Sequence, residues 1–219
     1  MTIKENLDSI YASLPSDVKL VAVSKMQSPD RILEAYSAGQ RRFGENKVQE
    51  LIAKMPVLPK DIEWHFIGHL QTNKVKFIAP FVHVIQSIDS LRLLMEVDQQ
   101  AEKNNRVIAC LLELYIASEE TKYGLDYNEA EALLSSEEFK NLNHVKITGV
   151  MGMATFTDNT EVIEMEFRKL REYFDSLSRR YFSTNPGFSE ISMGMSSDFH
   201  LAIKNGSTMV RIGSAIFND

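Results

Sequence analysis

Short apolar runs alternate with amphipathic stretches along almost the whole chain. Leu20–Ser24 is nearly continuously apolar, which is typical of a strand buried on both faces. The stretch that follows opens with Ser28 as a helix N-cap and Pro29 at the first helical position, and it closes at Gly39. Because the same order of strand and helix repeats to the C-terminus, the pattern predicts an α/β fold with a parallel sheet.

Eight such units account for nearly all of the sequence. We predict strands at Leu20–Ser24, Arg42–Gly44, Ile62–Ile67, Val82–Gln86, Val107–Ile116, Val145–Val150, Glu190–Ser192 and Met209–Ile212. We predict further helices at Lys47–Lys54, Asn73–Ile78, Ser90–Lys103, Asn128–Leu134, Ile163–Tyr181 and Ser196–Asn205. Eight strands are the number that closes a (β/α)₈ barrel, or TIM barrel. The prediction is one such barrel over residues 1–219 with an extra N-terminal helix at Lys4–Leu14; an open α/β sheet is the alternative.

The composition of the chain limits the kinds of function that it can have. The chain has 219 residues, 44% of them hydrophobic and 25% charged, and a formal net charge of -6, which argues against broad nucleic-acid binding. Cys110 is the only cysteine, so we expect a buried thiol and no internal disulfide. The N-terminus shows no leader pattern, and no apolar run approaches the ~20 residues of a membrane span. We therefore expect a cytoplasmic monomer without membrane contact.

Candidate phosphate-binding loops follow the last two strands, at the barrel end where functional residues gather. These loops read SMGMS and RIGS. Gly194 and Gly213 allow a close backbone approach, and Ser192 and Ser214 offer hydroxyl donors. Each loop alone is an ordinary turn, but the pair at this position favours a phosphate site.

Lys25 follows the first strand and is the candidate for covalent chemistry. In a barrel mouth, partial desolvation and a neighbouring cation would lower the pKa of its amine, so that the neutral form attacks an aldehyde and makes a Schiff base. The first and eighth strands are neighbours in a closed barrel, so Lys25 is expected to face the phosphate loops. An aldehyde with a phosphate is the chemistry of pyridoxal 5′-phosphate (PLP).

Two histidines, His65 and His69, stand four residues apart. No HExxH pattern surrounds them, so we interpret them as hydrogen-bonded side chains near the barrel mouth and predict no metal site. The chain also lacks a GxGxxG or P-loop pattern, so dinucleotide and ATP binding are without support.

Several segments carry a resemblance to a known family. They are VAVSK (Val21–Lys25), FGENKVQE (Phe43–Glu50), WHFIGHLQTNK (Trp64–Lys74), TKYG (Thr121–Gly124), SMGMSSD (Ser192–Asp198) and GSTMVRIGSAIF (Gly206–Phe217). In order and spacing they resemble the YggS/PROSC family of PLP-binding, PLP-homeostasis proteins, essentially from end to end. The departures are small: Met26 and Ser214 stand where threonine is frequent, and Asn218 stands where glycine is common.

The resemblance implies roles for individual residues. Lys25 carries the cofactor, Arg211 lies beside the pyridine nitrogen, and Asn46 lies near the ring. The phosphate is held by Ser192, Gly213 and Ser214. The full predicted cofactor-binding set is Lys25, Asn46, Ser192, Met193, Gly194, Arg211, Gly213 and Ser214.

The chain also resembles the barrel domain of alanine racemases, so a PLP-dependent racemase of low activity is the alternative function. In those enzymes the second base, a tyrosine, comes from an additional β-domain, which we do not expect here because the chain ends at Asp219. One cofactor face should then be open to water, which works against carbanion chemistry. Arg211 would also leave the pyridine nitrogen unprotonated and weaken PLP as an electron sink.

The sequence therefore favours a protein that stores, buffers or passes on PLP and is not an enzyme. PLP-dependent apo-enzymes are possible acceptors of the cofactor. A sensor that binds PLP and another protein remains open at this point.

Overall fold

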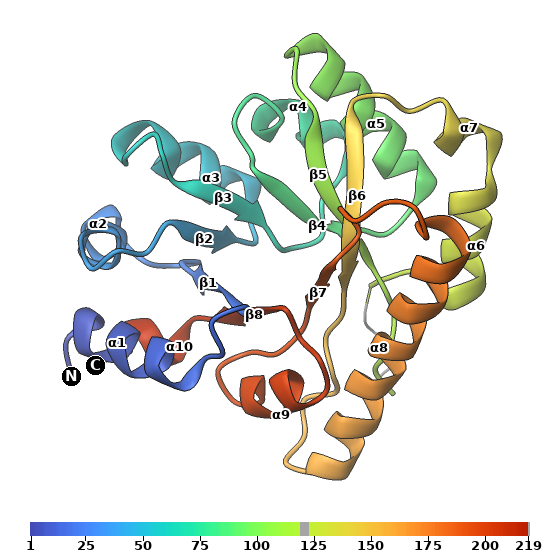
Figure 1. Cartoon of the computed structure of the whole chain (residues 1–219). Coiled ribbons are helices and arrows are strands. Elements are labelled where there is room, and N and C mark those ends of the chain that lie inside the picture. Colours follow the sequence, from blue (N-terminus) through green and yellow to red (C-terminus); the bar gives the residue numbers. More distant parts are fainter. Residues whose placement is uncertain (119–122, 219) are drawn as a thin grey trace.

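The structure is a computed structural model that describes residues 1–118 and 123–218. Eight parallel strands form a closed barrel in sequence order, and helices surround it (Figure 1). The strands are β1 (Lys19–Val23), β2 (Arg42–Glu45), β3 (Glu63–Phe66), β4 (Val84–Ile88), β5 (Ile108–Glu113), β6 (Val145–Met151), β7 (Glu190–Ser192) and β8 (Met209–Ile212). The predicted (β/α)₈ barrel is confirmed, and the open sheet is not. Thr121 and Lys122 of the TKYG segment lie outside the described residues.

Helices cover the outside of the strand ring. They are α1 (Ile3–Ser13), α2 (Pro29–Ser37), α3 (Val48–Lys54), α4 (Val75–Ile78), α5 (Leu91–Lys103), α6 (Tyr127–Ser135), α7 (Glu137–Lys140), α8 (Thr160–Tyr181), α9 (Phe199–Lys204) and α10 (Ser214–Phe217). Short 3₁₀ turns precede β3 at Met55–Val57 and α4 at Thr72–Lys74. Along the described residues, no helix is both long and apolar enough to cross a membrane.

The barrel closes between its first and last strands. Val21 of β1 pairs with Arg211 of β8, and Ala22 pairs with Ile212. This seam places the loop after β1 beside the loop after β8, as the sequence predicted. The extra N-terminal helix α1 packs against α2 and α10 (Figure 1). Asn6 of α1 donates a buried hydrogen bond of 3.0 Å to the Ile216 carbonyl of α10, which ties the two chain ends together.

Most of the core lies between the strands and the helices. The long helix α8 turns an apolar stripe of Ile163, Phe167, Leu170 and Leu177 toward this core. Cys110 of β5 is fully buried as expected, and burial raises the pKa of its thiol well above its usual range. A second, smaller apolar cluster consists of Val84, Leu111 and Met151.

The element boundaries differ from the prediction where local hydrogen bonds compete with the ladder. Val82 donates to the Ile78 carbonyl in the turn that follows α4, so β4 begins only at Val84. The fifth strand ends at Glu113 rather than Ile116, because Leu125 pairs back onto this segment. The short helices α7 and α10 were not predicted, since four residues are too few to show a helical period.

Candidate functional site

The carboxyl-terminal ends of the strands surround an open pocket of about 620 Å³. This volume is within the ~300–1,000 Å³ of small-molecule sites. Five of the predicted cofactor-binding residues line it: Lys25, Asn46, Arg211, Gly213 and Ser214. The barrel therefore brings together residues that are up to 189 positions apart, from Lys25 to Ser214, at the end where TIM barrels bind their ligands.

Lys25 lies at the tip of a tight turn that follows β1. The Gln27 N–H closes the turn on the Ser24 carbonyl at 3.0 Å. Met26 takes a left-handed backbone conformation with φ 63°, which is uncommon for a side chain of this size. Its N–H donates to Glu50 Oε2 at 2.8 Å, and this bond helps to hold the strained residue in place. The Lys25 side chain itself is exposed, so the desolvation expected from the sequence is not present.

A buried ionic network anchors this turn from below. Lys54 Nζ of α3 donates to the Ser24 carbonyl at 2.9 Å and to Glu45 Oε1 at 2.8 Å. The Ser24 hydroxyl also donates to Glu45 Oε1, at 2.6 Å. Burial raises the pKa of Glu45 against the opposing effect of Lys54 and Ser24, and the close ammonium keeps a counter-charge beside it. Both backbone neighbours of Lys25 are thus held by side chains of α3.

Arg211 forms part of the pocket floor from the barrel interior. Its Nη1 donates to the Ser192 hydroxyl at 2.6 Å, and its Nη2 donates to the Gly152 carbonyl at 3.0 Å. Burial lowers the pKa of Arg211 to about 10, although Glu113 and Asp198 raise it. The guanidinium is therefore a fixed cation and hydrogen-bond donor at pH 7.

The loop after β8 presents backbone donors on one side of the pocket. The N–H groups of Gly213 and Ala215 both point to Ser196 Oγ, at 3.2 and 3.4 Å. Ser196 belongs to the loop after β7 and lines the pocket. A Cβ on Gly213 would come within 3.2 Å of Val23, so glycine lets this loop lie close to the end of β1. Two N–H groups that converge on one oxygen are the kind of donor set that a phosphate oxygen accepts.

Asn46 and Gly68 complete another part of the lining. Asn46 Oδ1 is buried and accepts no hydrogen bond from the described residues, so it is available to a ligand donor. A Cβ on Gly68 would lie 2.3 Å from the Asn46 carbonyl oxygen, a distance that no packing tolerates. Gly68 therefore lets the loop after β3 close against Asn46. Gly68 lies in the WHFIGHLQTNK segment, and its close approach to Asn46 was not predicted.

Three predicted site residues do not line the pocket. Ser192 is buried within the barrel, where its hydroxyl donates to Gln86 and accepts from Arg211. Its hydroxyl is thus directed to the barrel interior rather than to a phosphate, and Ser192 positions Arg211 instead. Met193 is fully buried in the main core. Gly194, at φ 96°, accepts from the Arg211 N–H at 2.9 Å and shapes the turn between β7 and α9.

Other lining residues were not predicted to bind the cofactor. They are Val23, Ile67, Gly68, Met153, Phe156, Met195, Ser196 and Ser197. The loop after β6, which supplies Met153 and Phe156, was missed. The rule that every loop at this barrel end contributes to the site could have identified it.

Comparisons with known proteins agree with this geometry. The family model described as "Alanine racemase, N-terminal domain" matches residues 1–219. A pyridoxal phosphate homeostasis protein of Aquifex aeolicus is 42% identical over 202 residues, which cover 92% of this chain and 86% of the relative. One from Haemophilus influenzae is 37% identical and covers 99% of this chain and 95% of the relative. This chain belongs to the pyridoxal phosphate homeostasis protein family.

Solved structures place the fold in the same family. PipY of Synechococcus elongatus without PLP has a TM-score of 0.92 and 35% identity, with 99% of this chain and 100% of PipY covered. PipY with PLP bound has a TM-score of 0.88. An alanine racemase of Clostridium difficile shares the fold, with a TM-score of 0.81 at 13% identity, and this chain covers 59% of its length.

The two histidines of the quoted family segments have separate partners. His69 Nδ1 lies 3.0 Å from Asp89 Oδ2, and its ring stacks on Tyr123 with centroids 4.3 Å apart. His65 is buried and its Nδ1 lies 2.8 Å from Gln86 Nε2. The expectation that both are hydrogen-bonded is confirmed, but His65 lies inside the barrel and not at its mouth.

Glu113 is a buried acid close to Arg211, and its ionisation makes the free energy of unfolding depend on pH. Burial, together with the charge of Asp89, raises the pKa of Glu113 to about 7, while Arg211 lowers it. An unfolded glutamate ionises near 4.3. Between these values the unfolded chain releases its proton first, so the stability contributed by the protonated native form is lost as pH rises through about 7.

Relative to the parent, Glu113→Gln is therefore expected to gain about 1–3 kcal/mol of stability between pH 5 and pH 8. Urea unfolding at both pH values measures the difference. Glu138→Gln, at an exposed position on α7, is the matched control for loss of a surface carboxylate. A Glu113→Gln protein with the same relative stability at pH 5 and pH 8 would contradict the raised pKa.

Proposed function

We propose that this protein binds PLP in the pocket at the carboxyl-terminal end of the barrel, holds it covalently on Lys25, and serves PLP homeostasis. The observation that most directly supports this proposal is the position of Lys25. This exposed lysine lies on a fixed turn and lines the same pocket as the loop after β8, whose N–H groups converge on one oxygen. The names of relatives with 37–42% identity support the same conclusion.

The lining offers a partner for each functional group of this cofactor. PLP, when bound, supplies an aldehyde carbon that a lysine amine attacks, and its phosphate and aromatic ring give non-covalent affinity. Lys25 Nζ would make the covalent link, and the Gly213 and Ala215 N–H groups, with the Ser196 and Ser214 hydroxyls, would hold the phosphate. Arg211 would donate to the ring nitrogen without giving up a proton, and Asn46 Oδ1 would accept from a ring substituent.

We propose that the protein stores or passes on the cofactor and does not turn over a substrate. The pocket is open: Lys25 is exposed, and Phe156 on the opposite loop is 87% exposed. Water at the reacting centre works against carbanion chemistry, whereas an open face permits release to an acceptor. The fixed donor Arg211 also disfavours the protonated ring that makes PLP a strong electron sink.

Chemical fixation tests the binding site. Protein loaded with PLP and reduced with borohydride should carry one pyridoxyl group, which peptide mass spectrometry should map to Lys25. Lys47, exposed on the adjacent loop, is the internal control because it is also an accessible amine. Labelling that favours Lys47 or spreads evenly over the lysines would refute the assignment.

Cofactor transfer tests the homeostasis role. Holo-protein mixed with a PLP-dependent apo-enzyme should restore that enzyme's activity, because a carrier must release its cofactor. Alanine and serine should not be racemised at the turnover of a true racemase. Failure to reactivate the apo-enzyme would favour a sensor, and fast racemisation would favour the alternative enzyme.

A further inference from the structure

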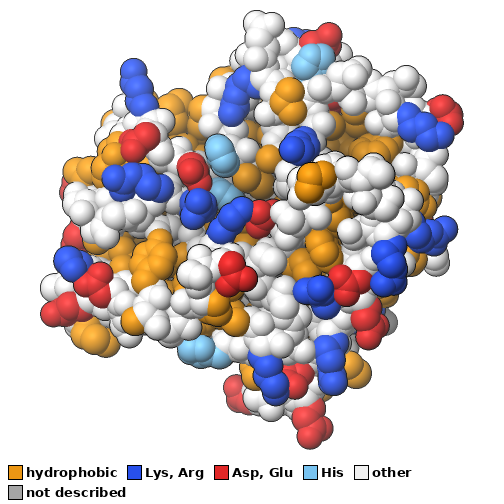
Figure 2. Space-filling model, viewed as in Figure 1, with side chains coloured by type: hydrophobic (Ala, Val, Ile, Leu, Met, Phe, Trp, Pro, Cys, Tyr) orange, Lys and Arg blue, Asp and Glu red, His pale blue; other side chains and the backbone are white. Residues whose placement is uncertain are grey.

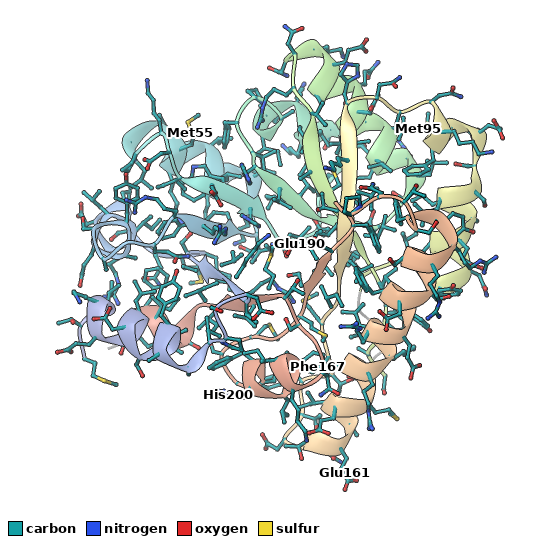
Figure 3. All side chains as sticks on the ribbon, viewed as in Figure 1. Met55, Met95, Glu161, Phe167, Glu190 and His200 are labelled. Carbon is teal, nitrogen blue, oxygen red and sulfur yellow. The ribbon has the colours of Figure 1, made fainter. Side chains whose placement is uncertain are left out.

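A second pocket opens at the other end of the barrel, where the strands begin. Its volume is about 260 Å³, less than half that of the candidate PLP site. Basic, acidic and histidine side chains gather over the middle of the barrel on the face that Figure 2 shows. The charged residues and histidines that line this pocket are Lys19, Arg42, Glu63, His65, His83 and Glu190. Figure 3 labels Glu190 close to the centre of the barrel.

The charges of this pocket are paired. Lys19 Nζ bonds to Glu190 Oε1, and Arg42 Nε lies 2.9 Å from Glu63 Oε2. Two cations and two anions give a lining with no net charge when the histidines are neutral. A simple anion would meet two carboxylates, and a simple cation would meet two basic groups. A ligand that carries both charges can satisfy both kinds of group, which favours a zwitterion.

A hydrogen-bond chain crosses the barrel interior from the PLP site to this pocket. Arg211 Nη1 donates to Ser192 Oγ at 2.6 Å. The Ser192 hydroxyl donates to Gln86 Oε1 at 2.7 Å, and Gln86 Nε2 lies 2.8 Å from His65 Nδ1. These side chains come from β8, β7, β4 and β3, and contacts between β7 and β4 are possible only through the centre of a closed ring.

The direction of every bond in this chain is fixed by Arg211. A guanidinium can only donate, so the Ser192 hydroxyl accepts from it and gives its own proton to the Gln86 carbonyl. The Gln86 amide nitrogen must then donate to His65, and Nδ1 of His65 is the acceptor. Burial, with smaller effects of His83, Arg42 and Lys19, holds the pKa of His65 at about 3, so the ring is neutral at pH 7.

A neutral imidazole that accepts at Nδ1 carries its proton on Nε2. Nε2 lies on the side of the ring away from Gln86, and His65 lines the amino-end pocket. This nitrogen is buried and has no hydrogen-bond partner within residues 1–118 and 123–218. A buried donor without an acceptor destabilises the protein, so the site favours a ligand that brings an acceptor oxygen.

We propose that the amino-end pocket binds a small zwitterion, a free α-amino acid, whose carboxylate accepts from His65 Nε2–H. The carboxylate would lie beside Lys19 and Arg42, and the ammonium would lie beside Glu63 and Glu190. The site is separate from the PLP pocket and does not depend on the proposed function, so it is tested on PLP-free protein.

The tautomer of His65 tests whether its proton is on Nε2, as the hydrogen-bond chain requires. Long-range ¹H–¹⁵N spectra of histidine-labelled protein should show His65 protonated at Nε2 and not at Nδ1. Gln86→Met should release this preference, because it removes the donor to Nδ1, while the spectrum of the exposed His200 should stay unchanged. A parent protein with His65 protonated at Nδ1 would overturn the proposal.

Ligand titration tests the site itself. Glycine and L-alanine should shift the His65 and His83 resonances in a saturable way, whereas acetate and ethylammonium, which carry one charge each, should bind at least about tenfold more weakly. Glu190→Gln should weaken L-alanine binding by about tenfold, and Glu138→Gln should not. Glu63→Gln, at a more exposed position, replaces Glu190→Gln if the latter does not fold.

Each other outcome overturns the proposal. Acetate binding as strongly as L-alanine would make this an anion site. Shifts at the Gly213 loop without shifts at His65 would place the amino acid in the PLP pocket. The absence of any saturable shift would leave the His65 Nε2–H group without a ligand.

Discussion

Lys25→Ala is expected to abolish the near-visible absorbance band that PLP gives when it is linked to this protein. The variant should also have no covalent link that borohydride can reduce. The exposed amine on the turn after β1 is the group assigned to the covalent link, and alanine offers no nucleophile. Absorbance spectra of PLP-loaded parent and variant, with and without borohydride, measure the effect. Weak non-covalent binding should remain, because the donors at Gly213 and Ser196 are untouched.

Two controls make this result specific. Lys25→Arg keeps the positive charge and lacks the nucleophilic amine, so it should also lose the band. Lys47→Ala removes a nearby exposed amine and should keep the band. Since Lys25 is exposed, both of its variants should unfold within about 0.5 kcal/mol of the parent. A band of parental intensity in Lys25→Ala would disprove the assignment.

Lys54→Met is expected to cost about 3–5 kcal/mol of the free energy of unfolding. The Lys54 ammonium is the counter-charge of Glu45, whose side chain has no exposed surface, and the variant would leave that carboxylate buried without it. It would also remove the donor to the Ser24 carbonyl and loosen the turn that carries Lys25. Urea unfolding and PLP loading of the same samples measure both effects.

The double variant Glu45→Gln/Lys54→Met separates charge burial from packing. It should recover part of the lost stability, because no uncompensated carboxylate remains. PLP loading should stay impaired in the double variant, since the Ser24 carbonyl still lacks its donor. A loss below 1 kcal/mol in Lys54→Met would mean that Glu45 takes up a proton or finds another partner at little cost.

The strand ring was predictable because its signal is local. Runs such as Leu20–Ser24 are apolar on both faces, and turn residues such as Gly39 separate them from amphipathic helices. Boundaries were predicted less well where a contact distant in sequence decides them. The end of β5 is one example, because the hydrogen bond from the Leu125 N–H to the Glu113 carbonyl cannot be foreseen from the apolar run.

The candidate site was predicted in part. Lys25, Asn46, Arg211, Gly213 and Ser214 do line one pocket. Ser192 does not, because on a short strand of a closed barrel the direction of a side chain is set by register, and this hydroxyl points to the interior. Sequence spacing gives the loop in which a residue lies but not the side of the barrel wall it faces.

The sequence alone determined the order of the eight units, the family resemblance and the lysine assigned to the cofactor, since these depend on residue type and spacing along the chain. Only the tertiary structure revealed the network of Glu45 and Lys54 under the turn, and the hydrogen-bond chain from Arg211 to His65. Both join side chains from separate strands and helices. Their energies come from burial and bond direction, which exist only after the barrel has closed.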